Sequence, residues 1–445
     1  MRDGNVAGKF VRTVFGAVLC SASFLSQAQA VNPTAPTQTL TPLTLAQAET
    51  IAIANQPRML AAQLRARASV QRIREARSSL YPTIAFNATG VGVADTGTAT
   101  AAGALTTSSI SDRFAYGGNL VQLVTDFGRT SALIASSRSS AEAQADLATL
   151  TTAQVKLNVR KAYYEVLGSE AVLHAAEDAL NNRKLISRQV GALAQSQLRS
   201  TLDVNFAGVL ESEAELAMVR AQSTVRQMRV HLASTMGLQQ PIVAPVADVA
   251  LPAPLDADPT SLLPQADTQR ADLSAAHAQQ KAAAQFALSE KRLSYPTLSA
   301  AGAAGEIPFH DHTLHDNYAA AGFNLNIPVF NGGLFAARRS EAELEANART
   351  HDAEELKLEV NEQVRDGWYR ADEAFRSLDV SARLVAQSKE ALRLAKARYD
   401  AGLGSIVELN EAQLNETSAE IGAADATYSY LISRANLDYA AGLLN

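Results

Sequence analysis

Apolar residues recur at every seventh position over long stretches of this chain. Two series near the C-terminus consist of Leu378, Val385, Leu392 and Tyr399, followed by Leu414, Ile421, Tyr428 and Ala435. A period of 3.5 residues is typical of helices that wind around neighbouring helices, and small alanines let those neighbours approach closely. We therefore interpret these stripes as helical core and not as a binding site.

Proline is missing from the same stretches. No proline occurs between Pro82 and Pro241, and none follows Pro328. Because proline breaks helices, these gaps permit long ones. The pattern predicts helices near residues 44–79, 129–198, 203–236, 264–294, 333–400 and 405–441. At a rise of 1.5 Å per residue, each of the longest would measure about 100 Å, which indicates the wall of a long helical tube.

Four stretches between these helices are short, rich in Gly, Thr, Ala and aromatic residues, and bounded by Pro or Gly. They cover residues 82–94, 113–125, 296–306 and 317–329. We predict that each is a strand. From Phe323 to Ile327 apolar residues alternate with asparagines. Either a barrel wall between lipid and water or a half-buried surface hairpin produces this alternation.

The number of predicted strands constrains the first of these alternatives. Four strands cannot close a membrane barrel, since the smallest known ones use about eight. An open sheet in lipid would leave backbone groups unpaired at its edges, at a cost of several kcal/mol each. If the strands enter a membrane, several copies of the chain must therefore contribute to one barrel.

The two halves of the chain share one layout. The matching motifs, in order, are Tyr81-Pro82-Thr83 with Tyr295-Pro296-Thr297, Asp126-Phe127-Gly128-Arg129 with Phe330-Asn331-Gly332-Gly333, Ser200-Thr201-Leu202-Asp203-Val204 with Ser405-Ile406-Val407-Glu408-Leu409, and Met236-Gly237-Leu238 with Ala441-Gly442-Leu443. We predict a tandem duplication, with a first repeat over residues 44–238, a proline-rich linker over 239–263 and a second repeat over 264–445. The predicted fold class is mainly α with a small β part.

Residues 1–30 have the features of a secretory signal peptide. Arg2, Lys9 and Arg12 form its positive end, an apolar stretch follows, and Ala28-Gln29-Ala30 is a small-residue cleavage site. Residues 31–43 then form an N-terminal linker. The single cysteine, Cys20, lies inside the signal after Leu19, where a lipidated cysteine would normally follow a small residue, so we expect no lipid anchor. No later stretch has 18 consecutive apolar residues, so any membrane crossing would use strands.

Charge and motifs exclude several functional classes. The chain has 39 Lys and Arg against 45 Asp and Glu, without a basic run, so nucleic acid is not an expected partner. It has no Gly-x-Ser-x-Gly elbow and no phosphate-binding fingerprint, so we expect neither an enzyme nor a cofactor. One cluster, which runs from His310 to Asp316 and includes His312 and His315, has metal-ligand chemistry. The cluster lies between the third and fourth predicted strands, where a polar outer loop needs no further reason, so we expect no metal site there.

From about residue 43 to 443, the sequence resembles the TolC family of outer-membrane factors. The motifs that carry the resemblance are Leu45-Ala46 through Asn55-Gln56-Pro57, both Tyr-Pro-Thr starts, Ile327-Pro328-Val329-Phe330-Asn331-Gly332-Gly333, and Tyr399-Asp400-Ala401-Gly402-Leu403. The resemblance implies a homotrimer whose twelve strands form one outer-membrane barrel and whose twelve helices form a periplasmic tunnel. It further implies an exit duct for efflux or type I secretion of small molecules or proteins, with a periplasmic adaptor and an inner-membrane transporter as partners.

The family's gate lies at the periplasmic tunnel end. By resemblance, Tyr399, Asp203, Glu408 and Glu411 occupy the positions of its gating tyrosine and acids, whereas its gating arginine falls at Gly404; Arg199, in the first-half turn, is our candidate substitute. Glu408 and Glu411 are three residues apart, so both can face one side of a helix. Three copies would then form carboxylate rings that favour cations, although acids also suit the start of any helix.

One alternative function remains open at this point. A periplasmic coiled-coil adaptor or scaffold without a membrane barrel would also show heptads and a secretory signal. It would not explain two matched hairpins that begin with Tyr-Pro-Thr.

Overall fold

The computed structural model describes residues 42–91, 99–100, 107–108, 113–197, 199–255, 258–310 and 315–445. The predicted signal peptide, Cys20 and most of the predicted linker at 31–43 lie outside these residues, as do positions 311–314.

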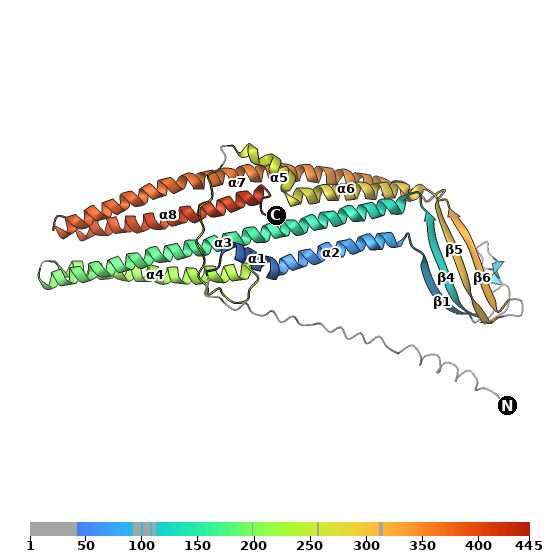
Figure 1. Cartoon of the computed structure of the whole chain (residues 1–445), viewed down its shortest axis with the longest axis horizontal. Coiled ribbons are helices and arrows are strands. Elements are labelled where there is room, and N and C mark those ends of the chain that lie inside the picture. Colours follow the sequence, from blue (N-terminus) through green and yellow to red (C-terminus); the bar gives the residue numbers. More distant parts are fainter. Residues whose placement is uncertain are drawn as a thin grey trace, which may run out of the picture. The chain divides into compact units, whose positions relative to one another are not determined.

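Helices dominate the described chain, and a four-stranded sheet lies at one end of them (Figure 1). The first half contains α1 (Leu45–Asn55), α2 (Pro57–Ser78), β1 (Thr83–Val91), the two-residue strands β2 (Ala99–Thr100) and β3 (Thr107–Ser108), β4 (Arg113–Thr125), α3 (Arg129–Gln195) and α4 (Thr201–Thr235). The second half contains the 3-10 turn η1 (Pro259–Leu262), α5 (Leu263–Gln269), α6 (Ala271–Lys291), η2 (Arg292–Ser294), β5 (Thr297–Phe309), β6 (Asn317–Asn326), α7 (Leu334–Asp400) and α8 (Ile406–Ala440). The predicted fold class is confirmed.

Equivalent helices in the two halves have equal lengths. Helices α3 and α7 each have 67 residues, and α4 and α8 each have 35. Each 67-residue helix begins after a glycine in the left-handed region, Gly128 (φ 90°) or Gly333 (φ 86°). The sequence alignment, which set Gly128 opposite Gly332, was therefore wrong by one residue. Phe127 (φ 55°) is the counterpart of Gly332 (φ 64°), and this position favours glycine because a side chain is strained there.

The predicted helices at 44–79 and 264–294 are each broken in two, which the sequence analysis did not predict. The first break is at Gln56, whose backbone is extended, and Pro57 starts α2 because its missing N–H is not needed in a first turn. The second break is at Arg270, which is also extended although no proline follows it. In each half, the break packs against the glycine that ends the last helix. A Cβ on Gly237 would lie 2.8 Å from Asn55 backbone atoms, and one on Gly442 would lie 2.9 Å from Gln269.

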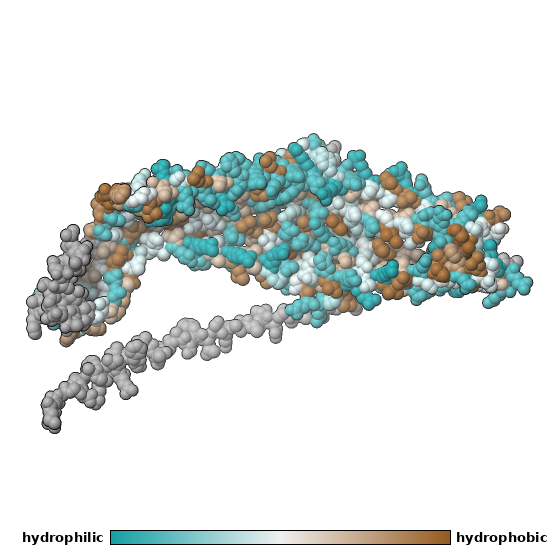
Figure 2. Space-filling model, turned by 180° about the vertical axis from the view of Figure 1, so that it is seen from behind, coloured by the Kyte–Doolittle hydropathy of each residue, from teal (hydrophilic) through white to brown (hydrophobic). Residues whose placement is uncertain are grey.

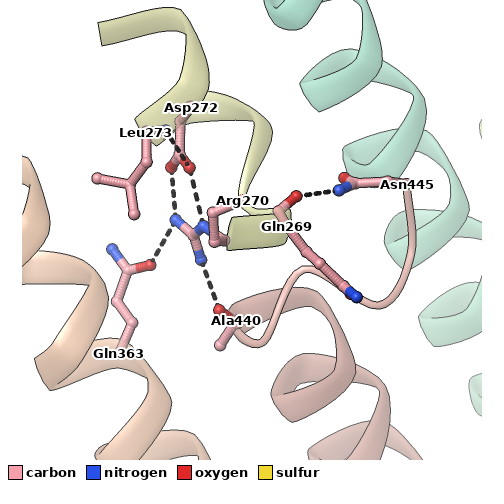
Figure 3. A network of polar contacts seen from close by, with 7 residues as sticks. All are labelled: Gln269, Arg270, Asp272, Leu273, Gln363, Ala440 and Asn445. Carbon is pink, nitrogen blue, oxygen red and sulfur yellow. Dashed lines mark hydrogen bonds and ion pairs between the residues drawn. The ribbon is translucent and has the colours of Figure 1, made fainter. Parts of the chain in front are cut away.

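A buried arginine holds the second break in place (Figure 3). Arg270 is 4% exposed. Its guanidinium donates to the Asp272 carboxylate at 2.9 Å, to Gln363 Oε1 at 3.0 Å and to the carbonyl of Ala440 at 3.2 Å. The break is thus tied to α7 and to the end of α8. A buried guanidinium is tolerable because these groups satisfy its donors.

The main core surrounds the middle of α3, where α1 and the ends of α4 and α8 meet it. Val159, Tyr163 and Leu232 are fully buried there. The Tyr163 hydroxyl lies 2.8 Å from the Leu43 carbonyl and 2.6 Å from that of Ala247. Leu43 also forms a bridge with Val246, so part of the predicted linker at 239–263 packs on the helices. Elsewhere hydrophilic and hydrophobic residues are mixed over the helical surface (Figure 2).

Candidate functional site

The sheet has the order β1-β4-β5-β6, and all its neighbouring strands are antiparallel. Strands β1 and β6 are its two edges. Among the described residues, neither edge has a further strand beside its row of backbone N–H and C=O groups. The register matches Val121 in β4 with Ala301 in β5, and Thr297 in β5 with Asn326 in β6.

The two faces of this sheet differ in polarity because side chains alternate along each strand. One face carries large apolar side chains that are exposed in the single chain, namely Ile84, Phe86, Leu120, Phe323 and Leu325. The opposite face carries Asn87, Asn119, Ser299, Asn324 and Asn326. On that face, Asn87 Nδ2 donates to Asn119 Oδ1 at 2.8 Å. The alternation predicted at residues 323–327 is thus present in β6 and recurs in β1 and part of β4, although Val121 of β4 lies on the otherwise polar face.

Such a sheet fits a wall between hydrocarbon and water. Phe86 is 72% exposed and Phe323 is 78% exposed, and lipid would remove that apolar surface from water. No helix in the described ranges combines the length and the apolarity that a membrane crossing needs.

The far end of the sheet holds a small aromatic and acidic group. Tyr116 packs beside Phe86 and Phe114, and its hydroxyl donates to the Glu306 carboxylate. His310 Nε2 lies 2.9 Å from Asp316 Oδ1 in the loop that follows β5. The described residues contain no group of three metal-ligating side chains, and His312 lies outside them. The metal-binding alternative for this loop therefore stays untested.

At the other end of the helices, the α3–α4 turn meets the α7–α8 turn. Arg199 Nη2 donates to the backbone carbonyl of Tyr399 at 3.1 Å, and its guanidinium lies 4.4 Å from the centre of the Tyr399 ring. A cation over an aromatic face is attracted by the ring's negative centre. Two of the five predicted gate residues, one from each half, are therefore in direct contact.

Tyr399 is 4% exposed, in a cluster that includes Val190, Ala207 and Leu409 from three other helices. Its hydroxyl makes no hydrogen bond with the described residues. Burial raises the pKa of Tyr399, while the positive charge of Arg199 lowers it. The side chain is thus a neutral apolar anchor between the two turns at ordinary pH.

The three predicted acids are not hydrogen-bonded to Tyr399. Asp203 forms a capping box with Ser200, the N-cap residue of α4. Its carboxylate accepts from the Ser200 N–H at 3.3 Å, and its own N–H donates to Ser200 Oγ at 3.2 Å. Glu408 Oε1 lies 3.1 Å from Arg398 Nε, and both side chains are about half exposed. Glu411 is exposed one turn further along α8.

The sequence analysis missed Arg398, which pairs with Glu408 and also donates to the Leu403 carbonyl at 3.4 Å. Its place in the last turn of α7, where cations suit the helix dipole, was the available signal. The local surroundings also favour a glycine at position 404, where the family has its gating arginine. A Cβ on Gly404 would lie 3.2 Å from the Tyr399 nitrogen, and the Gly404 N–H donates to the Arg398 carbonyl at 3.1 Å.

Comparisons with known proteins agree with this architecture. The sequence model of the family described as Outer membrane efflux protein matches residues 50–238 and 262–443. The solvent efflux pump outer membrane protein SrpC of Pseudomonas putida is 26% identical over 263 residues, which are 58% of this chain and 55% of that protein. The outer membrane protein TolC of Escherichia coli is 25% identical over 152 residues, which are 34% of this chain and 30% of that protein. The matched regions thus span about half or less of these curated relatives.

Solved structures share the fold. The structure of CusC matches with a TM-score of 0.76 at 18% identity, over 89% of this chain and 92% of that one. The outer membrane protein VceC of Vibrio cholerae matches with a TM-score of 0.73 at 18% identity, over 89% of this chain and 96% of that one.

Proposed function

Because the chain belongs to the outer membrane efflux protein family, we propose that it is one subunit of a trimeric exit duct through which small molecules or proteins leave the cell. Its sheet lies in the outer membrane, and its long helices form a tunnel in the periplasm. A periplasmic adaptor and an inner-membrane transporter deliver the cargo and the energy. The duct itself performs no chemistry and needs no cofactor.

One observation carries this proposal: a four-stranded sheet that is apolar on one face and polar on the other, with both edges open. In hydrocarbon, only closed barrels satisfy every backbone group of a sheet. Copies of the chain can supply that closure by pairing β6 of one with β1 of the next. A coiled-coil adaptor without a barrel has no use for such a sheet, so that alternative is not favoured.

The experiment is fractionation of cells that express the full chain with its own N-terminus. We expect the protein in the outer-membrane fraction and, without boiling, as an oligomer on a denaturing gel. After reconstitution it should form ion-conducting channels in planar bilayers. Recovery as a soluble periplasmic monomer would rule out the duct.

We propose in addition that the two turns at the far end of the helices form the gate. The contact of Arg199 with Tyr399 supports this role because it links the two halves of the chain at that end. Asp203 and Glu408 lie in the first turns of α4 and α8, and Glu411 lies one turn further along α8. Three copies would place these carboxylates around one axis. Such rings attract divalent cations. Replacing Glu408 and Glu411 by Ala should weaken the block of channel current by divalent cations, and an unchanged block would remove the carboxylate rings from the account.

A further inference from the structure

Two helices continue the edge strands of the sheet. Helix α2 leads into β1, and α7 leaves β6. Within the chain, α2 packs on α3 and α1, while α7 packs on α6, α8 and the segment before α6. Each helix therefore has a side that no described element of its own chain covers. In the middle of the chain, α3 follows β4 and α6 precedes β5, and β4 and β5 are paired. The contact of α3 with α6 therefore shows how the helices next to two paired strands pack against each other.

Comparing equivalent positions in the two halves shows which sides of α2 and α7 are uncovered. In α3 and α6, Ser139, Ala143 and Ala282 are buried. Counted from the matching helix starts and Tyr-Pro-Thr motifs, their counterparts are Leu344 and Ala348 in α7 and Ala68 in α2, all of them exposed. Leu344, for example, is 66% exposed. Small buried positions of α3 and α6 thus have exposed counterparts on the two edge helices, and we take these counterparts as the open seam of each edge helix.

Helix α2 carries a row of positive charge beside its open seam. Its 22 residues include six arginines and one acid. Arg58, Arg65 and Arg72 follow one another at intervals of seven, so they form one line along the helix, and all three are exposed. Within the described part of the chain, none of the three takes part in an ion pair.

Helix α7 carries the opposite charge beside its own open seam. Glu345, Asp352 and Glu359 also follow at intervals of seven and are exposed. Arg349 pairs with the first two, at 3.0 Å and 3.3 Å. Over residues 334–362 there are eight acids against four Lys and Arg. Two of these bases are turned to their own chain, because Arg338 pairs with Glu290 and Lys357 with Asp267.

The two rows would face each other if copies join through their sheet edges. Helix α2 runs toward the sheet and α7 runs away from it, so α2 of one copy lies antiparallel to α7 of the next. When each helix is viewed from its N-terminus to its C-terminus, the arginine row lies on the same side of the α2 seam as the acidic row does of the α7 seam. In an antiparallel pair, flanks of the same sense lie on the same side of the contact. Arg72 and Glu345 are then nearest the sheet, and Arg58 and Glu359 are furthest from it.

We infer that the Arg58, Arg65 and Arg72 row of α2 binds the Glu345, Asp352 and Glu359 row of α7 on a second copy of this chain, and that this pairing sets the order in which copies join. The inference rests on the proposed duct, for which it supplies the contact between subunits. Joining α2 to α7 is a head-to-tail contact, which can close into a ring. Joining α2 to α2, or α7 to α7, places like charges together and is disfavoured.

The test uses the full chain, extracted in mild detergent, and measures the concentration at which half of it is assembled. R58E/R65E reverses two charges of the row, and D352R/E359R reverses two charges of its partner. At low salt each variant should need about tenfold more protein for half-assembly, and in about 1 M salt the difference should shrink, because exposed charges are screened there. The combination of all four substitutions should restore assembly.

R67E/R74E is the matched control, since it makes the same change of charge at the same spacing on the same helix but on its other flank. Its half-assembly concentration should stay within about twofold of wild type. Circular dichroism reports whether each variant keeps its helices, and D352R/E359R carries the test if R58E/R65E does not fold. If the control equals R58E/R65E, or if the combination fails to restore assembly, the paired rows are overturned while the duct stands. A wild-type chain that never assembles overturns both.

Discussion

Replacing Arg199 by Ala is the sharpest test of the gate. In the described chain, this residue links the two turns through one hydrogen bond to the Tyr399 carbonyl and one cation–π contact with the Tyr399 ring. A hydrogen bond from a charged donor contributes about 1.5–3 kcal/mol, and a partly exposed cation–π contact about 0.5–1 kcal/mol. Because Arg199 is only partly buried, we take a total of about 2 kcal/mol. That free energy corresponds to a roughly 30-fold shift between joined and separated turns.

The assay is single-channel current in planar bilayers, compared among wild type and the variants R199A, R199K and R398A. R199A should spend up to about 30-fold more time in the open state than wild type. R199K should lie between the two, because a lysine keeps the charge but loses the planar guanidinium that stacks on the ring. R398A is the control. It removes an ion pair with Glu408 whose partners are half exposed, which contributes about 0–1 kcal/mol. If R199A conducts like wild type, or if R398A has the larger effect, the two turns are not held together as we propose.

The remaining predictions concern the stability of the full chain, measured by denaturant unfolding in detergent. Arg270→Ala should destabilise the chain by about 3–5 kcal/mol, because it leaves Asp272 with a mostly buried, unpaired charge; a loss below about 1 kcal/mol would contradict this. Burial raises the pKa of Tyr163 to about 12 from its ordinary 10.0, so the unfolded chain loses this proton first and stability should fall between pH 10 and 12. Tyr163→Phe should remove that part of the alkaline fall, and an unchanged pH profile would refute the assignment. Gly237→Ala should cost about 1–3 kcal/mol, because Gly237 has φ 76° and backbone atoms lie within 3 Å of the added carbon. Gly208→Ala in α4, where nothing lies within 4 Å, should instead stabilise by about 0.5–1 kcal/mol.

Much of the fold could be predicted from local features of the sequence. Heptads and the absence of proline defined helices whose ends lie within a few residues of α3, α4, α7 and α8. The strand predicted at residues 113–125 coincides with β4. These features are visible because proline, glycine and hydrophobic spacing act on the residues next to them.

The breaks in the short helices could not be predicted in the same way. At Arg270, no proline follows and the local sequence favours helix. The backbone is extended there because Gly442, far along the chain, packs against it and because Asp272, Gln363 and Ala440 accept from its guanidinium. Apart from Asp272, these partners lie far from Arg270 in sequence, and contacts over such separations leave no periodic signal.

The candidate gate was only partly accessible from the sequence. The contact between Arg199 and Tyr399 joins two turns that are 200 residues apart. Family resemblance named Tyr399, and Arg199 was chosen only as a substitute for the arginine that the family has at the position of Gly404, so neither gave a reason for the contact. The reason is geometric, since α3 packs along α8 and brings the two turns together.

The most direct test of the whole account is a disulfide between the two edges of the sheet. The predicted mature chain contains no cysteine, so N87C/N326C introduces one thiol on β1 and one on β6. Within one chain these strands are separated by β4 and β5, hence by about 14 Å, and a disulfide needs Cα atoms closer than about 7 Å. The two positions follow from the repeat, in which β1 corresponds to β5 and β6 to β4. Asn87 is the counterpart of Ala301, and Asn326 is the counterpart of Val121, and in the β4–β5 register Val121 lies opposite Ala301. Under oxidising conditions the account predicts a covalent ladder that ends at three chains in the outer-membrane fraction, whereas each single variant yields no such ladder. A double variant that stays monomeric after complete oxidation of its thiols would contradict the claim that copies of this chain close one barrel.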